Sequence, residues 1–155
     1  MIKVRRATID DAMTIAEFNQ AMALETEDKT LDPVTIKTGV TRMVEDDELG
    51  FYLVACSDEE IAGCLGITTE WSDWRNGLWW WIQSVYVSTG YRNQGVFSSL
   101  YSAVRSMAAD ESSVCGIRLY AEKDNGRAIR TYIRLGMIET EYRILEEEFG
   151  DGAKP

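Results

Sequence analysis

The half of the chain that begins at residue 78 alternates between strand-like and helix-like segments, and this alternation constrains the fold more than any other feature. Each strand-like segment is a short apolar run, and each helix-like segment repeats apolar residues every three or four positions. Strands that alternate with helices indicate parallel pairing through helical crossovers. The expected elements are a strand at 78–87, a helix at 94–109, a strand at 115–121, a helix at 125–135 that stops at Gly136, and a strand at 137–145.

The preceding residues predict two helices and a set of antiparallel hairpins. Asp32-Pro33 is a helix-start signal, because aspartate caps a helix and proline fits its first position. Asn76-Gly77 is a strong signal for a tight hairpin turn. We therefore expect one α/β domain over residues 1–155 with a mixed sheet, and a frayed tail from about residue 147. The expected elements are a strand at 2–7, a helix that opens at 8–11, a polar connection at 25–30, a helix from 33 to about 44, and strands at 51–56 and 61–70.

The chain contains no histidine and has a net charge of −10. The lack of histidine excludes a Ser-His-Asp or Cys-His triad and any histidine-ligated metal site. The acidic balance argues against nucleic-acid binding through a basic patch. It suits a cationic partner, although it also simply keeps a protein soluble. No apolar run approaches the roughly 18 residues of a membrane span, and the strand-like N-terminus lacks the apolar core of a signal peptide, so a cytoplasmic protein is expected.

The three cysteines, Cys56, Cys64 and Cys115, each lie in an apolar, strand-like run. Their spacing fits neither a zinc site nor a CxxC redox pair. We therefore expect three buried thiols that pack as small hydrophobic residues, and no metal.

A strand, a polar loop with glycines and a helix start follow one another between Val85 and Leu100. This arrangement directs several main-chain N–H groups toward one point, where the helix dipole adds positive potential. Such a site binds a phosphate or pyrophosphate group. Gly95 lets the backbone approach an anion closely, and Arg92 adds a positive charge. An ordinary strand-to-helix connection would show the same local pattern. The loop alone therefore does not distinguish a phosphate site from such a connection.

Two motifs together resemble the GCN5-related N-acetyltransferase (GNAT) superfamily, over nearly the whole chain. The segment Arg92-Asn93-Gln94-Gly95-Val96-Phe97 is similar to its (Arg/Gln)-x-x-Gly-x-(Gly/Ala) pyrophosphate loop, and it follows the strand end Val85-Tyr86-Val87 as in the family. Further on, Asn125-Gly126-Arg127-Ala128-Ile129-Arg130-Thr131-Tyr132-Ile133-Arg134-Leu135-Gly136-Met137 is similar to Asn-x-x-Ala-x-x-x-Tyr-x-x-x-Gly-Phe. Phe97 and Met137 depart from the family pattern, and neither change removes a main-chain donor.

The resemblance implies a mixed sheet of six to seven strands flanked by about four helices, in which two parallel strands splay apart to form a cleft for acetyl-CoA. It implies that Val85, Tyr86 and Val87 pair with the pantetheine arm like an added strand. The amide of Val85 then polarises the thioester carbonyl. The residues implied at the pyrophosphate are Arg92, Asn93, Gln94, Gly95, Val96, Phe97 and Ser98.

The same resemblance assigns two residues of the second motif. Tyr132 is implied to protonate the CoA thiolate, which is an easy step because a thiol is a good leaving group. Asn125 is implied to help hold the cofactor and the start of its helix. The alternatives are a core tyrosine and a simple helix cap.

All five tryptophans fall between Trp71 and Trp81. On a strand, Trp81 and Gln83 share one face with Trp79, while Trp80 and Ile82 share the other. One set can then pack under a helix, and the other, with Trp71 and Trp74 from the turn, can line an acceptor pocket. Aromatic faces favour a cationic head group. A tryptophan-rich core with a packed hairpin tip is the alternative.

Many relatives carry a glutamate where this chain has Gln83, and glutamine cannot accept a proton. The base is then another acid or a chain of water molecules. Glu25 and Glu27 lie in the connection between the first two helices, which borders the acceptor site in this fold, and Glu70 ends a strand beside Trp71. A solvated surface charge is the alternative for each of them.

We therefore expect an enzyme that transfers an acetyl group from acetyl-CoA to the primary amine of a small cationic metabolite, by direct attack in a ternary complex. Two alternatives stay open. One is acetylation of a protein N-terminus or lysine, and the other is acyl-CoA binding by a non-catalytic module, which the change to Gln83 would favour. The expected partner is a small amine, with no nucleic acid, membrane or metal, and a homodimer is left open.

Overall fold

The computed structural model describes residues 1–150 of the 155-residue chain. By their contacts these residues form two compact units, one from Met1 to Tyr120 and a second that begins at Ala121. The first unit holds the sheet and three of the α-helices, and the second holds α4. The single domain expected over residues 1–155 stays a prediction, and part of the tail expected to fray from about residue 147 lies outside the described residues.

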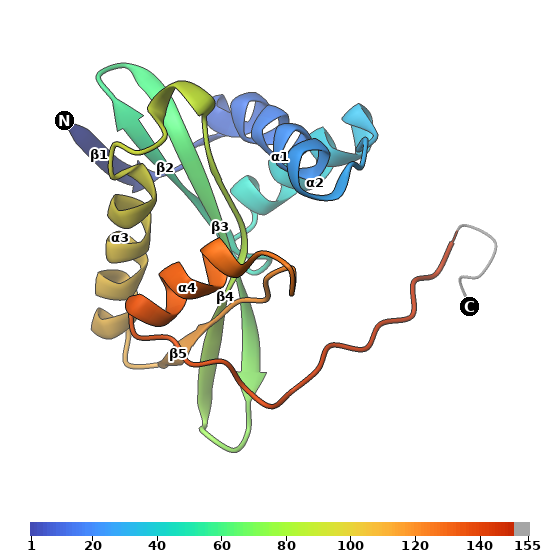
Figure 1. Cartoon of the computed structure of the whole chain (residues 1–155), viewed down its shortest axis with the longest axis vertical. Coiled ribbons are helices and arrows are strands. Elements are labelled where there is room, and N and C mark those ends of the chain that lie inside the picture. Colours follow the sequence, from blue (N-terminus) through green and yellow to red (C-terminus); the bar gives the residue numbers. More distant parts are fainter. Residues whose placement is uncertain (151–155) are drawn as a thin grey trace. The chain divides into compact units, whose positions relative to one another are not determined.

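The first unit is built on a five-stranded mixed sheet in the order β1-β2-β3-β4-β5 (Figure 1). Neighbours from β1 to β4 run antiparallel, and β5 pairs parallel with β4. This arrangement confirms the mixed α/β fold expected from the sequence. The strands are β1 (Ile2–Arg6), β2 (Phe51–Ser57), β3 (Glu60–Ser72), β4 (Gly77–Val87) and β5 (Val114–Arg118), and the helices are α1 (Ala12–Glu27), α2 (Pro33–Glu45) and α3 (Val96–Asp110), with short 3-10 turns η1 (Ile9–Asp11) and η2 (Thr89–Tyr91).

The first two helices begin and end where local chemistry dictates. The carboxylate of Asp32 accepts a hydrogen bond from the Thr35 N–H at 2.8 Å, and Pro33 occupies the first helical position of α2. Before α1, the buried carboxylate of Asp11 accepts from the Thr8 N–H at 2.7 Å. Helix α1 ends at Asp28, whose φ of 51° is left-handed. Glu25 and Glu27 therefore lie in the last turn of α1, and not in the connection to α2 where the sequence analysis placed them.

One face of the sheet packs against α1 and α2. Its buried cluster joins apolar residues of the helices, among them Ile15 and Val40, to Tyr52, Val54 and Cys64 of the sheet. Tyr86 of β4 packs against the same cluster. Side chains alternate between the two faces along a strand. The side chains of β4 on this face, Tyr86 among them, therefore lie on the same side of the sheet as α1.

The other face packs against α3. Gly63 points to this face, and a Cβ there would lie 3.1 Å from a methyl carbon of Val96, the first residue of α3, and 2.6 Å from the carbonyl oxygen of Tyr86. The absent side chain therefore lets α3 begin close to the sheet. The largest fully buried side chains include Leu53, Leu65 and Ile67 of the sheet and Leu100 and Val104 of α3, and burial of each contributes about 1.5–3 kcal/mol.

The second unit differs from the sequence expectation at its end. Its helix α4 (Gly126–Arg134) is confirmed, but no strand is assigned to 137–145. A strand needs partners for its backbone N–H and C=O groups, and this segment pairs with no other in the described residues. The apolar side chains of Ile138, Tyr142 and Leu145 are instead exposed. The described sheet therefore has five strands, not six or seven.

The three cysteines do not share one environment. Cys64 is buried, and burial raises the pKa of its thiol to about 12. Cys56 is half-buried and Cys115 is exposed. The expectation of three buried thiols is therefore wrong for Cys115, because its side chain lies on the solvent-facing side of the short β5.

Candidate active site

The strand β4 loses its partner on one side halfway along its length. It pairs with β5 from Leu78 to Trp81, against Val114 to Arg118, while its pairing with β3 continues to Val87. Among the described strands, none pairs with the β5 side of residues 82–87. The two parallel strands therefore separate beyond Trp81, and one edge of β4 is open there.

The register with β3 decides which main-chain groups face this open edge. The Ser88 N–H donates to the Ala62 carbonyl at 2.9 Å, so the adjacent pair, Gly63 and Val87, is a non-hydrogen-bonded pair of the ladder. The N–H and C=O of Val87 consequently point away from β3. The same alternation applies to Val85, two residues earlier. Main-chain donors and acceptors of Val85 and Val87 thus line the open edge.

The loop after β4 brings the start of α3 to the end of this edge. Asn93 and Gly95 both have left-handed φ values, 62° and 79°, which turn the chain sharply into the helix. The first helical bond runs from the Ser99 N–H to the Gly95 carbonyl at 3.0 Å. The N–H groups of residues 96–98 precede this bond and point out of the helix N-terminus, where the helix dipole is positive.

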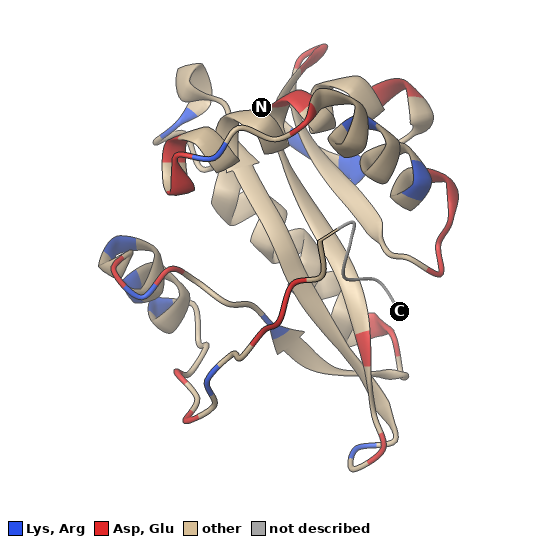
Figure 2. Cartoon of the chain, turned by 90° about the vertical axis from the view of Figure 1, so that its right-hand side faces the viewer, with Lys and Arg blue, Asp and Glu red and all other residues tan. Residues whose placement is uncertain are grey.

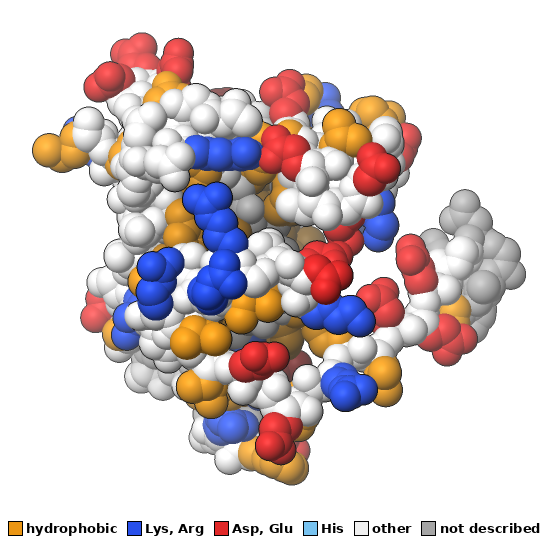
Figure 3. Space-filling model, viewed as in Figure 1, with side chains coloured by type: hydrophobic (Ala, Val, Ile, Leu, Met, Phe, Trp, Pro, Cys, Tyr) orange, Lys and Arg blue, Asp and Glu red, His pale blue; other side chains and the backbone are white. Residues whose placement is uncertain are grey.

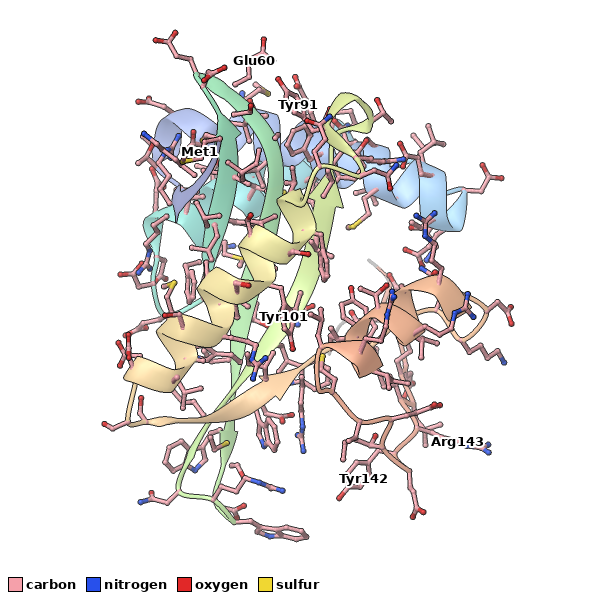
Figure 4. The ribbon with its side chains drawn as sticks, turned by 60° about the vertical axis from the view of Figure 1, so that its left-hand side comes forward. Met1, Glu60, Tyr91, Tyr101, Tyr142 and Arg143 are labelled. Carbon is pink, nitrogen blue, oxygen red and sulfur yellow. The ribbon has the colours of Figure 1, made fainter. Side chains whose placement is uncertain are left out.

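Side chains stabilise the loop itself. The amide of Gln94 donates to the Gly90 carbonyl at 3.0 Å. The hydroxyl of Tyr91 donates to the carboxylate of Glu60, and Figure 4 shows both residues at the same end of the sheet. This hydrogen bond raises the pKa of Tyr91. The loop is therefore tied to β3 on one side and closed on itself on the other.

Arg92 joins the loop to the end of α1. Its Nε donates to the Val87 carbonyl at 3.0 Å, and its guanidinium forms a 2.7 Å ion pair with Glu25. Glu25 also accepts a hydrogen bond of 3.1 Å from the hydroxyl of Tyr86. The hydrogen bond from Arg92 is the main reason that the pKa of Glu25 is lowered, so this carboxylate is ionised near neutral pH. A residue assigned to the acceptor side and one assigned to the cofactor loop are thus direct partners.

The tryptophan hairpin divides between core and surface. Trp80 and Ile82 are buried, and the ring of Trp80 meets that of Phe51 edge-on at 5.2 Å. Trp81 lies on the other face, 6.0 Å from the ring of Tyr120. Trp71 is 61% exposed near the hairpin tip. Of the two sets that alternate along β4, the one with Trp80 and Ile82 therefore packs inward, and Trp71 is not part of an enclosed pocket.

Trp79 is surrounded by the protein's own cations. The guanidinium carbons of Arg118 and Arg75 lie 3.9 Å and 4.9 Å from the centre of its ring. Arg118 also donates to Glu70 at 2.6 Å. A Cβ at Gly116 would lie 2.4 Å from the ring of Trp79, so glycine there lets the ring lie against β5.

The remaining acceptor-side residues have separate partners. Gln83 donates to the hydroxyl of Thr68 at 2.8 Å. Glu27 lies 3.6 Å from Lys29 and does not join the cluster of Glu25. The structure therefore brings Glu25 to β4 beside Tyr86, but leaves Glu27 on the surface.

In the second unit, Asn125 caps α4. Its side chain accepts from the Ala128 N–H at 3.2 Å. Tyr132 lies on α4 two turns later, and its carbonyl accepts from the Met137 N–H at 3.1 Å, after Gly136 turns the chain with a φ of 103°. The helix start and stop expected from the second motif are confirmed.

Two groups of residues escaped the sequence analysis. Three arginines of α4 stand three and four positions apart and so share a helix face; they are Arg127, Arg130 and Arg134. Figure 2 marks basic residues along this helix, in a chain whose net charge is −10, and Figure 3 shows basic side chains on the face of the molecule where α4 lies. The spacing of these arginines is visible in the sequence and would have indicated a basic helix face. The contact of Arg118 with Glu70 and Trp79 had no local signal, because the ion-pair partners are 48 residues apart.

Among the described residues, no group of three or more histidine, cysteine, aspartate or glutamate side chains is arranged to hold a metal ion. No described helix is long and apolar enough to cross a membrane. A groove between α1 and α2, lined among others by Met13, Glu17 and Lys37, contains none of the residues expected at the site.

Comparisons with known proteins agree with this geometry. The profile of the acetyltransferase (GNAT) family matches residues 13–137. A possible acetyltransferase from Clostridium difficile 630 is 40% identical, with 96% of this chain and 97% of that chain covered and a TM-score of 0.90. An aminoglycoside N-acetyltransferase in complex with CoA shares the fold at 12% identity, with 96% and 95% covered and a TM-score of 0.78. A comparison of the sequence with curated proteins found no significant match. The chain belongs to the GNAT family of acetyltransferases.

Proposed function

We propose that this acetyltransferase moves an acetyl group from acetyl-CoA to the primary amine of a small cationic metabolite, by direct attack in a ternary complex. The observation that carries the proposal is the open edge of β4 at Val85 and Val87, which ends at the N-terminus of α3. An extended chain with amide groups can pair with such an edge like an added strand. Pantetheine is a chain of this kind, and the diphosphate at its end suits the helix N-terminus.

The loop residues divide the work of holding the cofactor. The main chain from Gln94 to Ser98 would hold the pyrophosphate, and Gly95 leaves open space where a side chain would obstruct it. Arg92 supplies a positive charge, with Asn93 shaping the turn. The amide of Val85 would polarise the thioester carbonyl.

The chemical step needs an amine without its proton and a donor for the leaving thiolate. Tyr132 is the proposed donor, from its place in the second motif, and Asn125 positions the start of the same helix. Because a thiol with a pKa of about 8.5 leaves readily, the larger tasks are orientation of the two reactants and deprotonation of the amine.

A cationic acceptor is favoured by the charge and aromatic character of one face of β4. Glu25 is ionised and lies on this face beside Tyr86, and the partly exposed ring of Trp81 lies further along the same strand, with Gln83 between them. An ammonium group that leaves water needs a carboxylate or an aromatic face as its partner. The aminoglycoside acetyltransferases that share the fold act on small polar amines, but at 12% and 14% identity they show the fold alone.

The proposal is tested by release of free CoA thiol from acetyl-CoA with a panel of amines. The panel contains polyamines, aminoglycosides, a neutral aromatic amine and a peptide with a free N-terminus, and each product is identified by mass. Release with the small cations alone supports the proposal. Release with the peptide alone makes the enzyme a protein acetyltransferase, and binding of acetyl-CoA without release for any amine makes it a non-catalytic module. Absence of acetyl-CoA binding in calorimetry would overturn the cofactor site itself.

A further inference from the structure

The guanidinium of Arg92 stands between the two halves of the proposed site. Through Nε it binds the Val87 carbonyl at the open edge of β4, and through a terminal nitrogen it binds Glu25 at the end of α1. The ring of Tyr86 lies under the same guanidinium, with 5.5 Å between the guanidinium carbon and the ring centre. One side chain thus contacts a proposed cofactor edge and a proposed acceptor carboxylate.

These contacts use groups that the two substrates also need. A diphosphate carries more negative charge than a carboxylate and accepts paired hydrogen bonds from a guanidinium. A pantetheine chain that pairs with the open edge of β4 would contact the guanidinium of Arg92 at the Val87 carbonyl. Glu25, in turn, has its second carboxylate oxygen on the Tyr86 hydroxyl, which holds it beside β4 whether or not Arg92 is bound.

We propose that Arg92 exchanges Glu25 for the phosphates of the acyl-CoA, and that this exchange releases Glu25 to bind the ammonium group of the acceptor. The inference rests on the proposed function and adds an order of binding to it. Before the exchange, Arg92 itself occupies the place beside Tyr86 and Glu25 where a cation can bind. After it, a carboxylate with no protein cation faces the thioester end of the pantetheine.

The ion pair is weak enough to exchange. The side chains of Arg92 and Glu25 are 43% and 40% exposed, and pairs of this kind contribute about 0.2–1 kcal/mol. Loss of such a competitor strengthens the affinity of Arg92 for another anion by roughly 1.4- to five-fold. The coupling is also reciprocal, so the acceptor must strengthen acyl-CoA binding by the factor with which acyl-CoA strengthens acceptor binding.

The test is the dissociation constant of acetyl-CoA, measured by calorimetry for a set of variants at low salt. Glu25→Gln removes the competitor and is expected to tighten binding by about two- to five-fold. Glu17→Gln makes the same change on the exposed surface of α1, away from this cluster, and is expected to leave the constant unchanged. In an Arg92→Gln background, Glu25→Gln is expected to have no effect, because the arginine that it frees is absent.

The outcomes separate this inference from the proposed function. If wild-type protein binds acetyl-CoA but Glu25→Gln leaves binding unchanged or weakens it, the exchange is overturned and the proposed function stands. The exchange is equally overturned if Glu25→Gln tightens binding in the Arg92→Gln background, since the effect is then one of net charge. Failure of the wild-type protein to bind acetyl-CoA overturns both. Arg92→Met, which also removes the positive charge, replaces Arg92→Gln as background if the latter does not fold.

Discussion

The guanidinium carbon of Arg118 lies 3.9 Å from the centre of the Trp79 ring, and the same guanidinium binds Glu70. Part of the tryptophan cluster therefore already holds a cation that belongs to the chain. The clustering of tryptophans in the sequence indicated an aromatic surface for a cationic ligand. A proposed surface of this kind is limited to the part of β4 near Trp81, because Arg118 and Arg75 lie over the ring of Trp79 and Trp71 is exposed to solvent.

Arg118→Gln should destabilise the fold through loss of this contact. A cation over an aromatic ring contributes about 0.5–2 kcal/mol, and the exposed ion pair with Glu70 adds little. We expect a loss of about 1–2 kcal/mol in the free energy of unfolding, measured in urea by tryptophan fluorescence. Arg75→Gln is the matched control, since Arg75 lies 4.9 Å from the same ring and is more exposed. An equal loss in the two variants would contradict a specific role for Arg118.

Gly95→Val should weaken both folding and acetyl-CoA binding. A β-branched side chain disfavours the left-handed backbone at Gly95, at a cost of about 1–2 kcal/mol, and it would project into the space proposed for the pyrophosphate. Gly90→Val is the control, because Gly90 has open space around it but no positive φ. The dissociation constant of acetyl-CoA is measured for both. Equal affinities for Gly95→Val and wild type would remove the pyrophosphate from this loop.

Tyr132→Phe should lower the turnover number while the affinity for acetyl-CoA stays nearly constant. The change removes only the hydroxyl that is proposed to protonate the CoA thiolate. Turnover is measured with saturating substrates, under conditions in which a pre-steady-state burst is absent, so that chemistry limits the rate. An unchanged turnover number would return Tyr132 to a packing role on α4. Thermal unfolding of the variant checks that the hydroxyl is not needed for folding.

The features that the sequence predicted correctly depend on neighbours in the chain. The helix stop at Gly136, the cap at Asn125 and the helix start at Pro33 are each decided within four residues, and all three are present. The pairing of Glu25 with Arg92 joins residues 67 apart. The acidic connection and the loop arginine were both noted, but nothing local indicated that they meet, since only packing of α1 on β4 brings them together.

The expected strand at 137–145 failed for a related reason. Alternation of apolar residues predicts that a segment can form a strand, but the pairing depends on a distant edge that the segment itself does not encode. The burial of Cys115 also depends on distant elements, which its own segment does not encode. An apolar run around it predicted burial, yet the neighbouring elements leave that side of β5 to solvent.

The stability of the fold should fall in acid through Asp11. Its buried carboxylate takes two hydrogen bonds from Arg5, at 2.7 and 2.9 Å, and one from the Thr8 N–H. The hydrogen bonds from Arg5 are the main reason that the pKa of Asp11 is lowered. A carboxylate with a lowered folded-state pKa stabilises the fold above its unfolded value of about 3.9 and loses that contribution as the pH falls through the folded value.

Asp11→Asn should therefore cost about 1–3 kcal/mol at neutral pH, and its unfolding free energy should approach that of wild type as the pH falls through the lowered folded-state pKa of Asp11. Asp47→Asn is the matched control, since Asp47 pairs with the neighbouring Arg6 at 2.6 Å but is 80% exposed. We expect it to cost no more than about 0.5 kcal/mol at any pH. Urea unfolding from pH 2 to pH 7 gives both curves, and a pH-independent deficit for Asp11→Asn would contradict the assignment.

The early parting of β5 from β4 gives neighbouring amides of one strand different rates of hydrogen exchange. The alternation places the Tyr86 amide against β3, whereas the amides of Val85 and Val87 face the open edge. An amide held in a ladder exchanges only when the strand opens, while one that faces solvent exchanges from the folded state. The part of β4 beyond Trp81 should therefore take up deuterium quickly at every second amide. Acetyl-CoA should slow hydrogen exchange selectively at the amides of Val85 and Val87, so exchange along this strand reports cofactor binding.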